Sequence, residues 1–466
     1  MNHTNPTLRA EFGRYAVLSV LGMMAMSCYI LADTFFVAQG LGSEGLAALN
    51  LAIPVYNVIH GIGLLLGMGG ATRFSVLKSQ NAREEANVVY THTLGMAAAA
   101  AAVFVLVGLT VPGPLAALLG ATGTVHTMTT TYLRVLLLFA PAFLLNDVLQ
   151  CFMRNDGAPH LSMAATVTGS LANIVMDYIF IFPFGLGILG AVLATGVSPV
   201  IGILIQAPHW ANPRCGFRPV PCRPQRRTAA RIAALGVPSL LEQLSGAVVM
   251  VTFNFLILRL AGNTGVAAYG VVANLSLVVL AVYSGLAQGM QPLVSRAWGH
   301  GRRPDLFRLL RYALLSMAAV TVVVYLGIFA GAGTIAGVFN SEADPTLQAI
   351  AVQGLKLYFL GALFAGANVI LCIWFTSVER PAPAQAISLL RGLFVIVPAA
   401  LLLAALFGMP GVWLAFLVSE ALVSAVGCVL FFRSRGSLYP PSGEPRGPAP
   451  NPPPRPSGRG GVAALG

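Results

Sequence analysis

The stretch PHLSMAATVTGSLANIVMDYIFIFPFGLGILGAVLATGVSPVIGILIQAP, residues 159–208, decides the fold class. It contains two apolar runs, 159–182 and 187–208, which a short Gly- and Pro-containing turn separates. A membrane-spanning helix needs about 20 mostly apolar residues, so each run is long enough to cross a bilayer. Spanning strands would alternate apolar and polar residues, and these runs do not. The stretch therefore predicts two consecutive transmembrane helices.

The whole chain follows the same pattern. Of its 466 residues, 57% are hydrophobic and 9% are charged, and its mean hydropathy is +0.80. An average soluble protein has about 25% charged residues, so this composition excludes a water-soluble surface and predicts an all-α polytopic membrane protein. The twelve runs of spanning length are 15–38, 46–74, 89–111, 130–152, 159–182, 187–208, 230–258, 266–294, 308–332, 347–376, 384–407 and 410–432.

The 27 Lys and Arg residues set the expected orientation. All but Arg134, Arg259 and Lys356 fall in alternate loops, among them Arg380 and Arg391, or near the two ends of the chain. Cytoplasmic loops carry the excess of Lys and Arg, so we expect both termini in the cytoplasm and a multi-pass protein of the bacterial inner (plasma) membrane. The basic loops explain the net charge of +12, so we expect no nucleic acid as a partner. We also expect the protein to be a monomer in the lipid bilayer.

The two halves of the chain repeat. A shift of 220 residues aligns Gly42 with Gly262 and Gly69 with Gly289, among seven matches. Six helices per half is an even number, so the sequence predicts two parallel six-helix repeats around a central cavity, an architecture suited to alternating access. The expected organisation is a cytoplasmic N-terminus (1–13), an N-lobe of helices 1–6 (14–208), a cytoplasmic linker (209–229), a C-lobe of helices 7–12 (230–432) and a disordered Pro-rich cytoplasmic tail (433–466).

Ionisable groups inside spans are costly and are candidates for function. Asp33 in helix 1 and Asp177 in helix 5 both lie about 10 Å below the outer face, at 1.5 Å per residue. Asn173 is one turn from Asp177, and Thr195 in helix 6 reaches a similar depth. This oxygen-rich cluster suits either Na⁺ or a carboxyl group that exchanges protons, and both ions stay open.

Other polar side chains in the spans allow two interpretations. Asp147 is expected to be a solvated acid at the inner interface. Glu242 could neutralise a cationic substrate or pair with an arginine at the cytoplasmic rim, and both alternatives stay open. Asn254, Asn274 and Gln288 are further candidates for substrate binding, although polar side chains in spans are more often contacts between helices.

Motifs of enzymes are missing from the sequence. It contains no GxxxxGK[ST], HExxH or GxSxG motif, and no His/Cys cluster at metal-ligand spacing. Cys215 and Cys222 share a loop without CxxC spacing, so we expect free thiols. We therefore expect no enzyme and no cofactor, and any transport must be driven by an ion gradient.

Two segments resemble one family. DTFFVAQGLGSEGLAALNLAIPV (33–55) and RNDGAPHLSMAATVTGSLANIVMDYIFIFPFGLGILGAVLAT (154–195) are similar to the helix 1–2 and helix 4–6 signatures of multidrug and toxic compound extrusion (MATE) transporters. The resemblance covers about residues 10–435. It implies that Asp33, Asn173, Asp177 and Thr195 form the cation site of the N-lobe. Family members that bend helix 1 do so at a proline, whereas residues 15–38 contain none.

The sequence thus favours a Na⁺- or H⁺-coupled antiporter that exports amphipathic or cationic drugs and toxic compounds by alternating access. One alternative is a flippase of lipid-linked sugars, which predicts an arginine-rich groove for pyrophosphate. Arg134, Arg259 and Lys356 are too scattered to form one. A membrane-embedded enzyme or receptor is the third class, and the missing motifs and the repeat argue against it.

Overall fold

The computed structural model describes residues 7–213, 215–339 and 344–438. All regular elements in these ranges are helices. The expectations for residues 1–6 and 439–466, the outer parts of the predicted N-terminus and tail, lie outside the described residues. The predicted tail was placed too early, because helix α15 (Met409–Leu438) continues six residues past Phe432. No proline interrupts this segment before Pro440.

Two helices are each long enough to hold two membrane spans. They are α1 (Leu8–Ser79) and α9 (Arg226–Gly299), and each breaks at a single glycine. Gly42 has φ 66° and Gly262 has φ 63°, a left-handed conformation that glycine adopts without the penalty of a Cβ. The same break therefore recurs 220 residues later, as the sequence repeat predicted. The first part of α1 is helical from Leu8 to the break, and Pro54 is the only proline in α1.

The remaining helices complete twelve spans within the described residues. Nine helices are long and apolar enough to cross a membrane, and a pair bent by 49° makes a tenth; the breaks in α1 and α9 add two more. Other short pieces are bends or connections. The bounds are α2 (Arg83–Thr110), α3 (Pro112–Leu118), α4 (Gly123–Leu138), α5 (Ala140–Asn155), α6 (Pro159–Ile181), α7 (Ile188–Gln206), α8 (Pro208–Ala211), α10 (Arg303–Phe339), α11 (Pro345–Tyr358), η1 (Phe359–Gly361), α12 (Ala362–Ser377), α13 (Pro381–Leu389), η2 (Leu390–Phe394), α14 (Ile396–Phe407) and α15.

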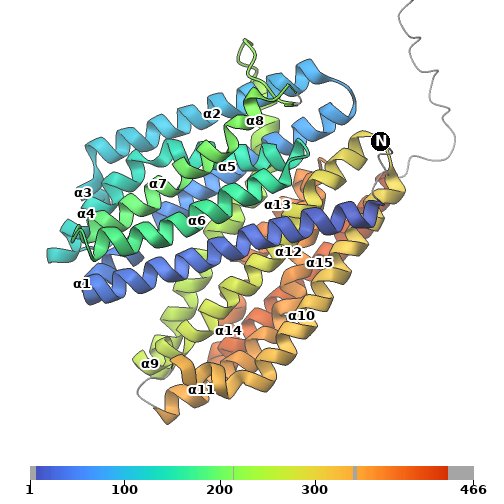
Figure 1. Ribbon diagram of the computed structural model, residues 1–466. Helices are drawn as coiled ribbons and strands as arrows, with labels where there is room; N and C mark the ends of the chain where they lie inside the picture. Colours follow the sequence, from blue (N-terminus) through green and yellow to red (C-terminus); the bar gives the residue numbers. More distant parts are fainter. Residues whose placement is uncertain (1–6, 214, 340–343, 439–466) are drawn as a thin grey trace, which may run out of the picture.

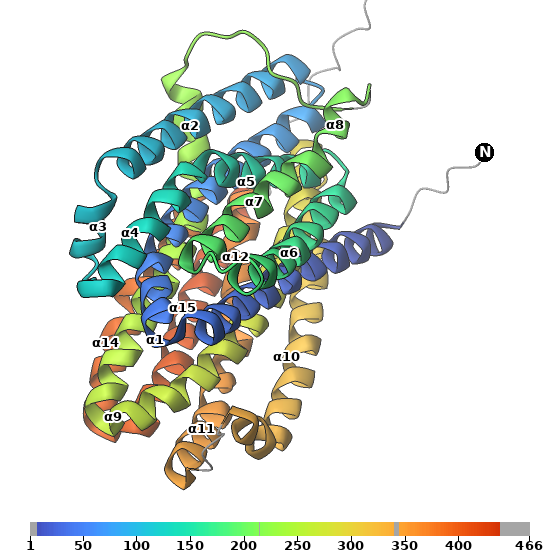
Figure 2. The same cartoon turned by 60° about the vertical axis from the view of Figure 1, so that its left-hand side comes forward.

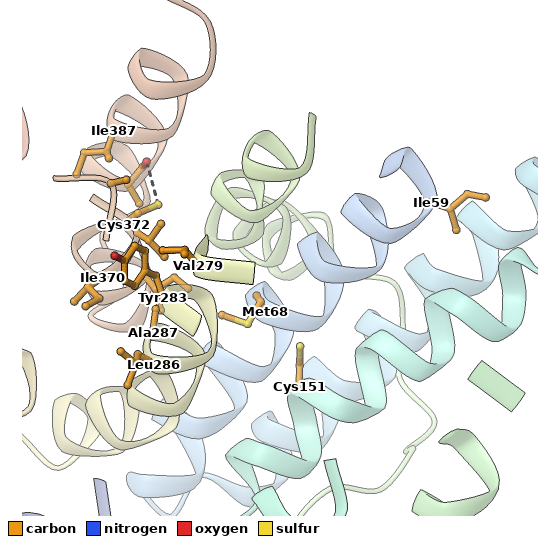
Figure 3. Packing of buried hydrophobic residues seen from close by; sticks show 14 of the residues in the cluster. Ile59, Met68, Cys151, Val279, Tyr283, Leu286, Ala287, Ile370, Cys372 and Ile387 are labelled. Atoms are coloured by element: carbon orange, nitrogen blue, oxygen red, sulfur yellow. Dashed lines mark hydrogen bonds between the residues drawn. The ribbon is translucent and has the colours of Figure 1, made fainter. Parts of the chain in front are cut away.

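The helices form two groups that lie side by side. Figures 1 and 2 show α1 to α7 in one group and α9 to α15 in the other. These are the predicted N-lobe and C-lobe, and buried apolar side chains of both belong to one hydrophobic cluster. Figure 3 shows Cys372 and Ile387 of the C-lobe packed beside Tyr283 of α9, while Met68 and Cys151 belong to the N-lobe.

The lobes touch closely at the end where α1 begins. Gly69 of α1 and Gly236 of α9 leave no room for a Cβ, because the backbone of the opposite helix lies against each of them. Gln291 of α9 donates a hydrogen bond to Thr72 Oγ1 at 3.0 Å, and Arg296 Nη2 lies 2.6 Å from Glu11 Oε2. We call this the closed end of the molecule.

One charged residue at the closed end bridges both lobes. Glu379, between α12 and α13, lies 3.0 Å from Arg73 of the N-lobe and 3.2 Å from Arg231 of the C-lobe. Toward the glycine breaks, the two lobes are farther apart. Asn274 lies about three turns before Gly285, which packs against Val20, yet Asn274 is exposed. The lobes are thus in contact at the closed end and separated toward the glycine breaks.

Candidate functional site

The N-lobe brings together the four residues that the sequence singled out. Asp33 comes from α1, Asn173 and Asp177 from α6, and Thr195 from α7, and all four are buried. The amide of Asn173 is assigned from its hydrogen bonds: its nitrogen donates to Asp177 Oδ2 at 3.1 Å, and its oxygen accepts from the Thr195 backbone N–H at 3.2 Å. Asn173 therefore joins α6 to α7 and orients the Asp177 carboxyl group.

The two carboxyl groups of this cluster face each other. Asp33 and Asp177 lie within hydrogen-bonding range of one another, and the Tyr132 hydroxyl lies in the same range of Thr195. Oδ1 of Asp33 and Oδ1 of Asp177 are buried and accept no hydrogen bond from a described residue. Two buried carboxylates this close cannot both stay ionised without a compensating cation or a shared proton. The cluster is thus chemically suited to bind one monovalent cation or exchange one proton.

A cavity adjoins this cluster; N-lobe residues and Gln288 of α9 line it. Thr195 lines it, whereas Asp33, Asn173 and Asp177 lie buried outside its lining. The expectation for Asp147, which also lines the cavity, was wrong. Asp147 is not a solvated acid, because it is buried and its Oδ2 lies 2.8 Å from Nδ1 of His60.

A second cavity lies in the C-lobe. Glu242 of α9 lines it, and its Oε1 accepts a hydrogen bond from Ser284 Oγ at 3.4 Å. The interpretation of Arg391 as a cytoplasmic loop charge was wrong. Arg391 belongs to the π-helical turn η2 inside a span, and its Nε lies 2.6 Å from Glu420 Oε1 of α15. Sequence reasoning missed Glu420, although an acid in the run 410–432 is the signal that identified Asp33.

The three amides proposed for substrate binding lie in different places. Gln288 lines the N-lobe cavity. Asn254 lies about five turns after Gly236, on the side of α9 that packs against the N-lobe. Asn274 lies about three turns before Gly285, which also packs against the N-lobe. Neither lines the two cavities. Asn254 is half-buried and Asn274 is exposed, which leaves both on the surface between the lobes.

Asp156 organises the linker that joins the lobes. Lys78 donates to Asp156 Oδ1, while Asp156 Oδ2 lies 2.7 Å from His209 Nε2 and accepts from the Gly216 backbone N–H at 3.0 Å. Cys215 is also close, so three potential metal ligands lie together. However, burial raises the pKa of the Cys215 thiol, which stays protonated and donates to the Phe217 carbonyl at 3.1 Å. The protein's own donors thus satisfy Asp156, and this cluster fastens the linker.

Replacing Asp156 should therefore destabilise the protein. We expect Asp156→Asn to lower the free energy of unfolding by about 2 kcal/mol, since it leaves the Lys78 ammonium without its buried partner. Thermal unfolding of the purified protein in detergent measures this change. Asp305→Asn, which removes a partner of the more exposed Arg308, is the matched control and should cost less than about 1 kcal/mol. Equal stability of the two variants would contradict the role assigned to Asp156.

Comparisons with known proteins agree with this architecture. The MatE family matches residues 19–179 and 238–402, most of each lobe. The multidrug export protein MepA of Staphylococcus aureus (strain MRSA252) is 25% identical over 442 residues, which cover 93% of this chain and 95% of that protein.

Solved structures of the same family share the fold. An outward-facing multidrug resistance MATE family transporter of the MOP superfamily has a TM-score of 0.87 at 23% identity, covering 92% of this chain and 96% of that one. A MATE crystal structure in complex with MaL6 also has a TM-score of 0.87, at 25% identity, with 92% and 97% covered. The chain belongs to the MatE family of multidrug and toxic compound extrusion transporters, which are membrane transporters and not enzymes.

Proposed function

We propose that the protein is a cation-coupled antiporter that exports amphipathic and cationic compounds. The observation that carries this proposal is the buried pair Asp33–Asp177, with an oxygen on each carboxyl group that accepts no hydrogen bond from a described residue. Such a pair gains free energy when it takes up a cation or a proton. Asn173 and Thr195 would complete the oxygen ligands for Na⁺ or hold the carboxyl groups for H⁺.

The coupling would work through the contact between the lobes. A ligand shifts a two-state equilibrium only by its different affinity for the two states. Part of α1 carries Asp33, and the same helix packs against Gly285 and Gly289 of the C-lobe. An ion that changes how α1 sits against α6 would therefore change the packing of the lobes, and outward release of substrate would follow inward movement of the ion.

Substrate binding is assigned to Glu242 in the C-lobe cavity. Its one hydrogen-bond donor among the described residues is a neutral hydroxyl. The arginine in electrostatic range of Glu242, Arg391, is held by Glu420, so Glu242 could still receive a cationic group of a substrate. The lining is mostly apolar and aromatic, including Tyr269, Tyr358 and Phe416, as amphipathic compounds require.

Dye efflux tests this function. In inverted vesicles, rhodamine 123 should accumulate when a Na⁺ or H⁺ gradient is imposed, and dissipating each gradient separately identifies the ion. Failure to move rhodamine 123, ethidium and other amphipathic cations under either gradient would contradict the proposed export.

The orientation of the chain has its own test. We propose that the closed end faces the cytoplasm, because the basic loops and both termini lie on that side in the predicted topology. In a Cys-free background, Ala117→Cys should react with an impermeant thiol reagent from outside the cell, whereas Pro219→Cys in the linker should react only after lysis. Both positions are exposed. The reverse pattern would overturn the orientation and place the Asp33–Asp177 pair toward the inner face.

A further inference from the structure

A histidine and an aspartate meet in the N-lobe cavity, apart from the four residues of the ion cluster. His60 of α1 and Asp147 of α5 both line this cavity, and Nδ1 of His60 lies 2.8 Å from Oδ2 of Asp147. Gly63, one turn after His60, makes room for the carboxyl group, because a Cβ at this position would collide with Oδ2. The close packing of α1 against α5 therefore holds the two side chains together.

The second ring nitrogen of His60 is available to a proton. No described residue forms a hydrogen bond with Nε2, and 13% of the side chain is exposed where it lines the cavity. The contact with Asp147 favours the tautomer that carries its hydrogen on Nδ1, which leaves the lone pair on Nε2. A proton that binds Nε2 converts the pair into an imidazolium and a carboxylate, which has no net charge.

The His60–Asp147 pair lies between the ion cluster and the closed end. Asp33 is 9 residues from the break at Gly42 and His60 is 18 residues from it, or about 14 Å and about 27 Å along the two parts of α1 at 1.5 Å per residue. Two tyrosines bridge these levels. The hydroxyls of Tyr29 and Tyr56 lie 2.7 Å apart, Tyr29 is in electrostatic range of Asp33, and the ring of Tyr56 stacks on His60 with the centroids 5.9 Å apart.

The other charged and titratable groups around the pair do not replace His60 as a proton acceptor near neutral pH. On α5, Cys151 and Arg154 line the cavity, and Arg154 donates to Cys151 Sγ at 3.3 Å. On α4, Tyr132 is in electrostatic range of Tyr56. Among the described residues, α6, α7 and α9 contribute uncharged side chains to the lining. Histidine is the residue type in this set that ordinarily changes charge between about pH 5 and 8.

We infer that the His60–Asp147 pair is a proton-transfer site through which the Asp33–Asp177 pair exchanges H⁺ with the cytoplasmic side. A proton released by a carboxyl group of Asp33–Asp177 would pass through water in the polar cavity and bind the lone pair of Nε2, while Nδ1–H stays hydrogen-bonded to Asp147. Opening of the closed end would let Nε2 release that proton to cytoplasmic water, which restores the neutral imidazole. The inference rests on the proposed function and names H⁺ as the coupling ion.

The charge of His60 can be measured without transport. The chain has seven histidines, and in NMR spectra of purified full-length protein with ¹⁵N-labelled histidine, the signal missing from His60→Gln identifies His60. We expect His60 in the wild-type protein to become protonated between about pH 8 and pH 5. In Asp147→Asn it should stay neutral over this range, because a buried imidazolium would have no counter-charge. A wild-type His60 that keeps one charge state from pH 5 to 8 would overturn the inference.

Transport driven by a pH jump tests the role of the pair. The variant His60→Gln/Asp147→Asn removes both members, so it leaves neither charge buried without a partner. In proteoliposomes, its rate of H⁺-driven rhodamine 123 transport should fall by about tenfold or more, since a positioned proton acceptor typically contributes at least this much. The wild-type rate should change with pH at the midpoint of the His60 titration, and the variant should lose this step. A pair that only joined α1 to α5 would change stability and leave the pH profile in place.

Two controls accompany this measurement. Rhodamine 123 binding, followed by fluorescence anisotropy, should change less than about threefold in His60→Gln/Asp147→Asn, because the variant keeps side chains of similar size and hydrogen-bonding groups. His126→Gln should transport as the wild type does, since Nε2 of His126 lies 3.1 Å from the Gly113 carbonyl oxygen and outside the cavity lining. If the double variant loses rhodamine 123 binding, the titration of His60 in the wild-type protein decides the question.

The possible failures can be distinguished. Normal H⁺-driven transport by His60→Gln/Asp147→Asn, or a pH profile that matches the wild type, would overturn the role of the pair and leave the proposed export intact. Wild-type protein that moves rhodamine 123 under a Na⁺ gradient but not under a pH gradient would do the same. Wild-type protein that moves amphipathic cations under neither gradient would contradict the proposed function together with this inference.

Discussion

Asp177→Asn should abolish the coupling of export to an ion gradient while the protein still folds and binds substrate. The substitution keeps the shape and one hydrogen-bonding oxygen, so Asn173 retains a partner at position 177. It removes the charge that would attract Na⁺ or accept a proton. The ion then no longer binds one conformation more tightly than the other, so it cannot shift the equilibrium between them. In proteoliposomes, we expect dye accumulation driven by an imposed Na⁺ or pH jump to fall by at least about tenfold, since an amide cannot replace a carboxylate as a proton acceptor.

Asp33→Asn serves as the matched variant of this experiment. Because Asp33 and Asp177 face each other in one site, the double variant should be little worse than either single variant. Full gradient-driven efflux by Asp177→Asn at normal expression would contradict the N-lobe ion site and move the coupling role to Glu242.

Gly236→Leu should prevent the lobes from closing. The backbone of α1 at Leu65 lies against Gly236, so a side chain at this position would have to push the two helices apart. Overpacking at an interior contact typically costs about 1–3 kcal/mol, and contact between two backbones leaves little room to relax. We expect the closed end to open and active transport to be lost.

Cysteine labelling measures this opening. Thr72 is fully buried at the contact between the lobes, and a Thr72→Cys thiol should react at least about tenfold faster in Gly236→Leu than in the parent protein, because reaction requires local opening. Gly270→Leu is the control, since Gly270 in the same helix has free space around its Cα. If Thr72→Cys stayed equally protected in all three backgrounds, the closed end would not depend on the Gly236 contact.

Much of the fold could be predicted from the sequence because it is written in local patterns. The length and composition of each apolar run indicate a span, and the break at Gly42 recurs at Gly262 with the same left-handed backbone. The N-lobe cluster was also accessible, since depth along a helix is proportional to residue number. These features need no knowledge of which side chains meet.

The partners of buried charges could not be predicted in this way. Asp147 pairs with His60, which lies 87 positions earlier in a different span, and only the packing of α1 against α5 brings them together. Arg391 was assigned to the loop charges because nothing in its neighbourhood indicates a π-helical turn. Its partner Glu420 lies 29 residues away on α15, so the ion pair becomes visible only once the C-lobe is assembled.

The most direct test of the central claim measures the ion that moves with the substrate. Proteoliposomes loaded with rhodamine 123, with no ion gradient imposed, allow dye efflux and either ²²Na⁺ uptake or internal pH to be followed together. If the Asp33–Asp177 pair carries the coupling ion, efflux through the wild-type protein will drive Na⁺ or H⁺ inward, and Asp177→Asn will show no such ion movement. Dye-dependent ion uptake of the same size in Asp177→Asn would contradict the account.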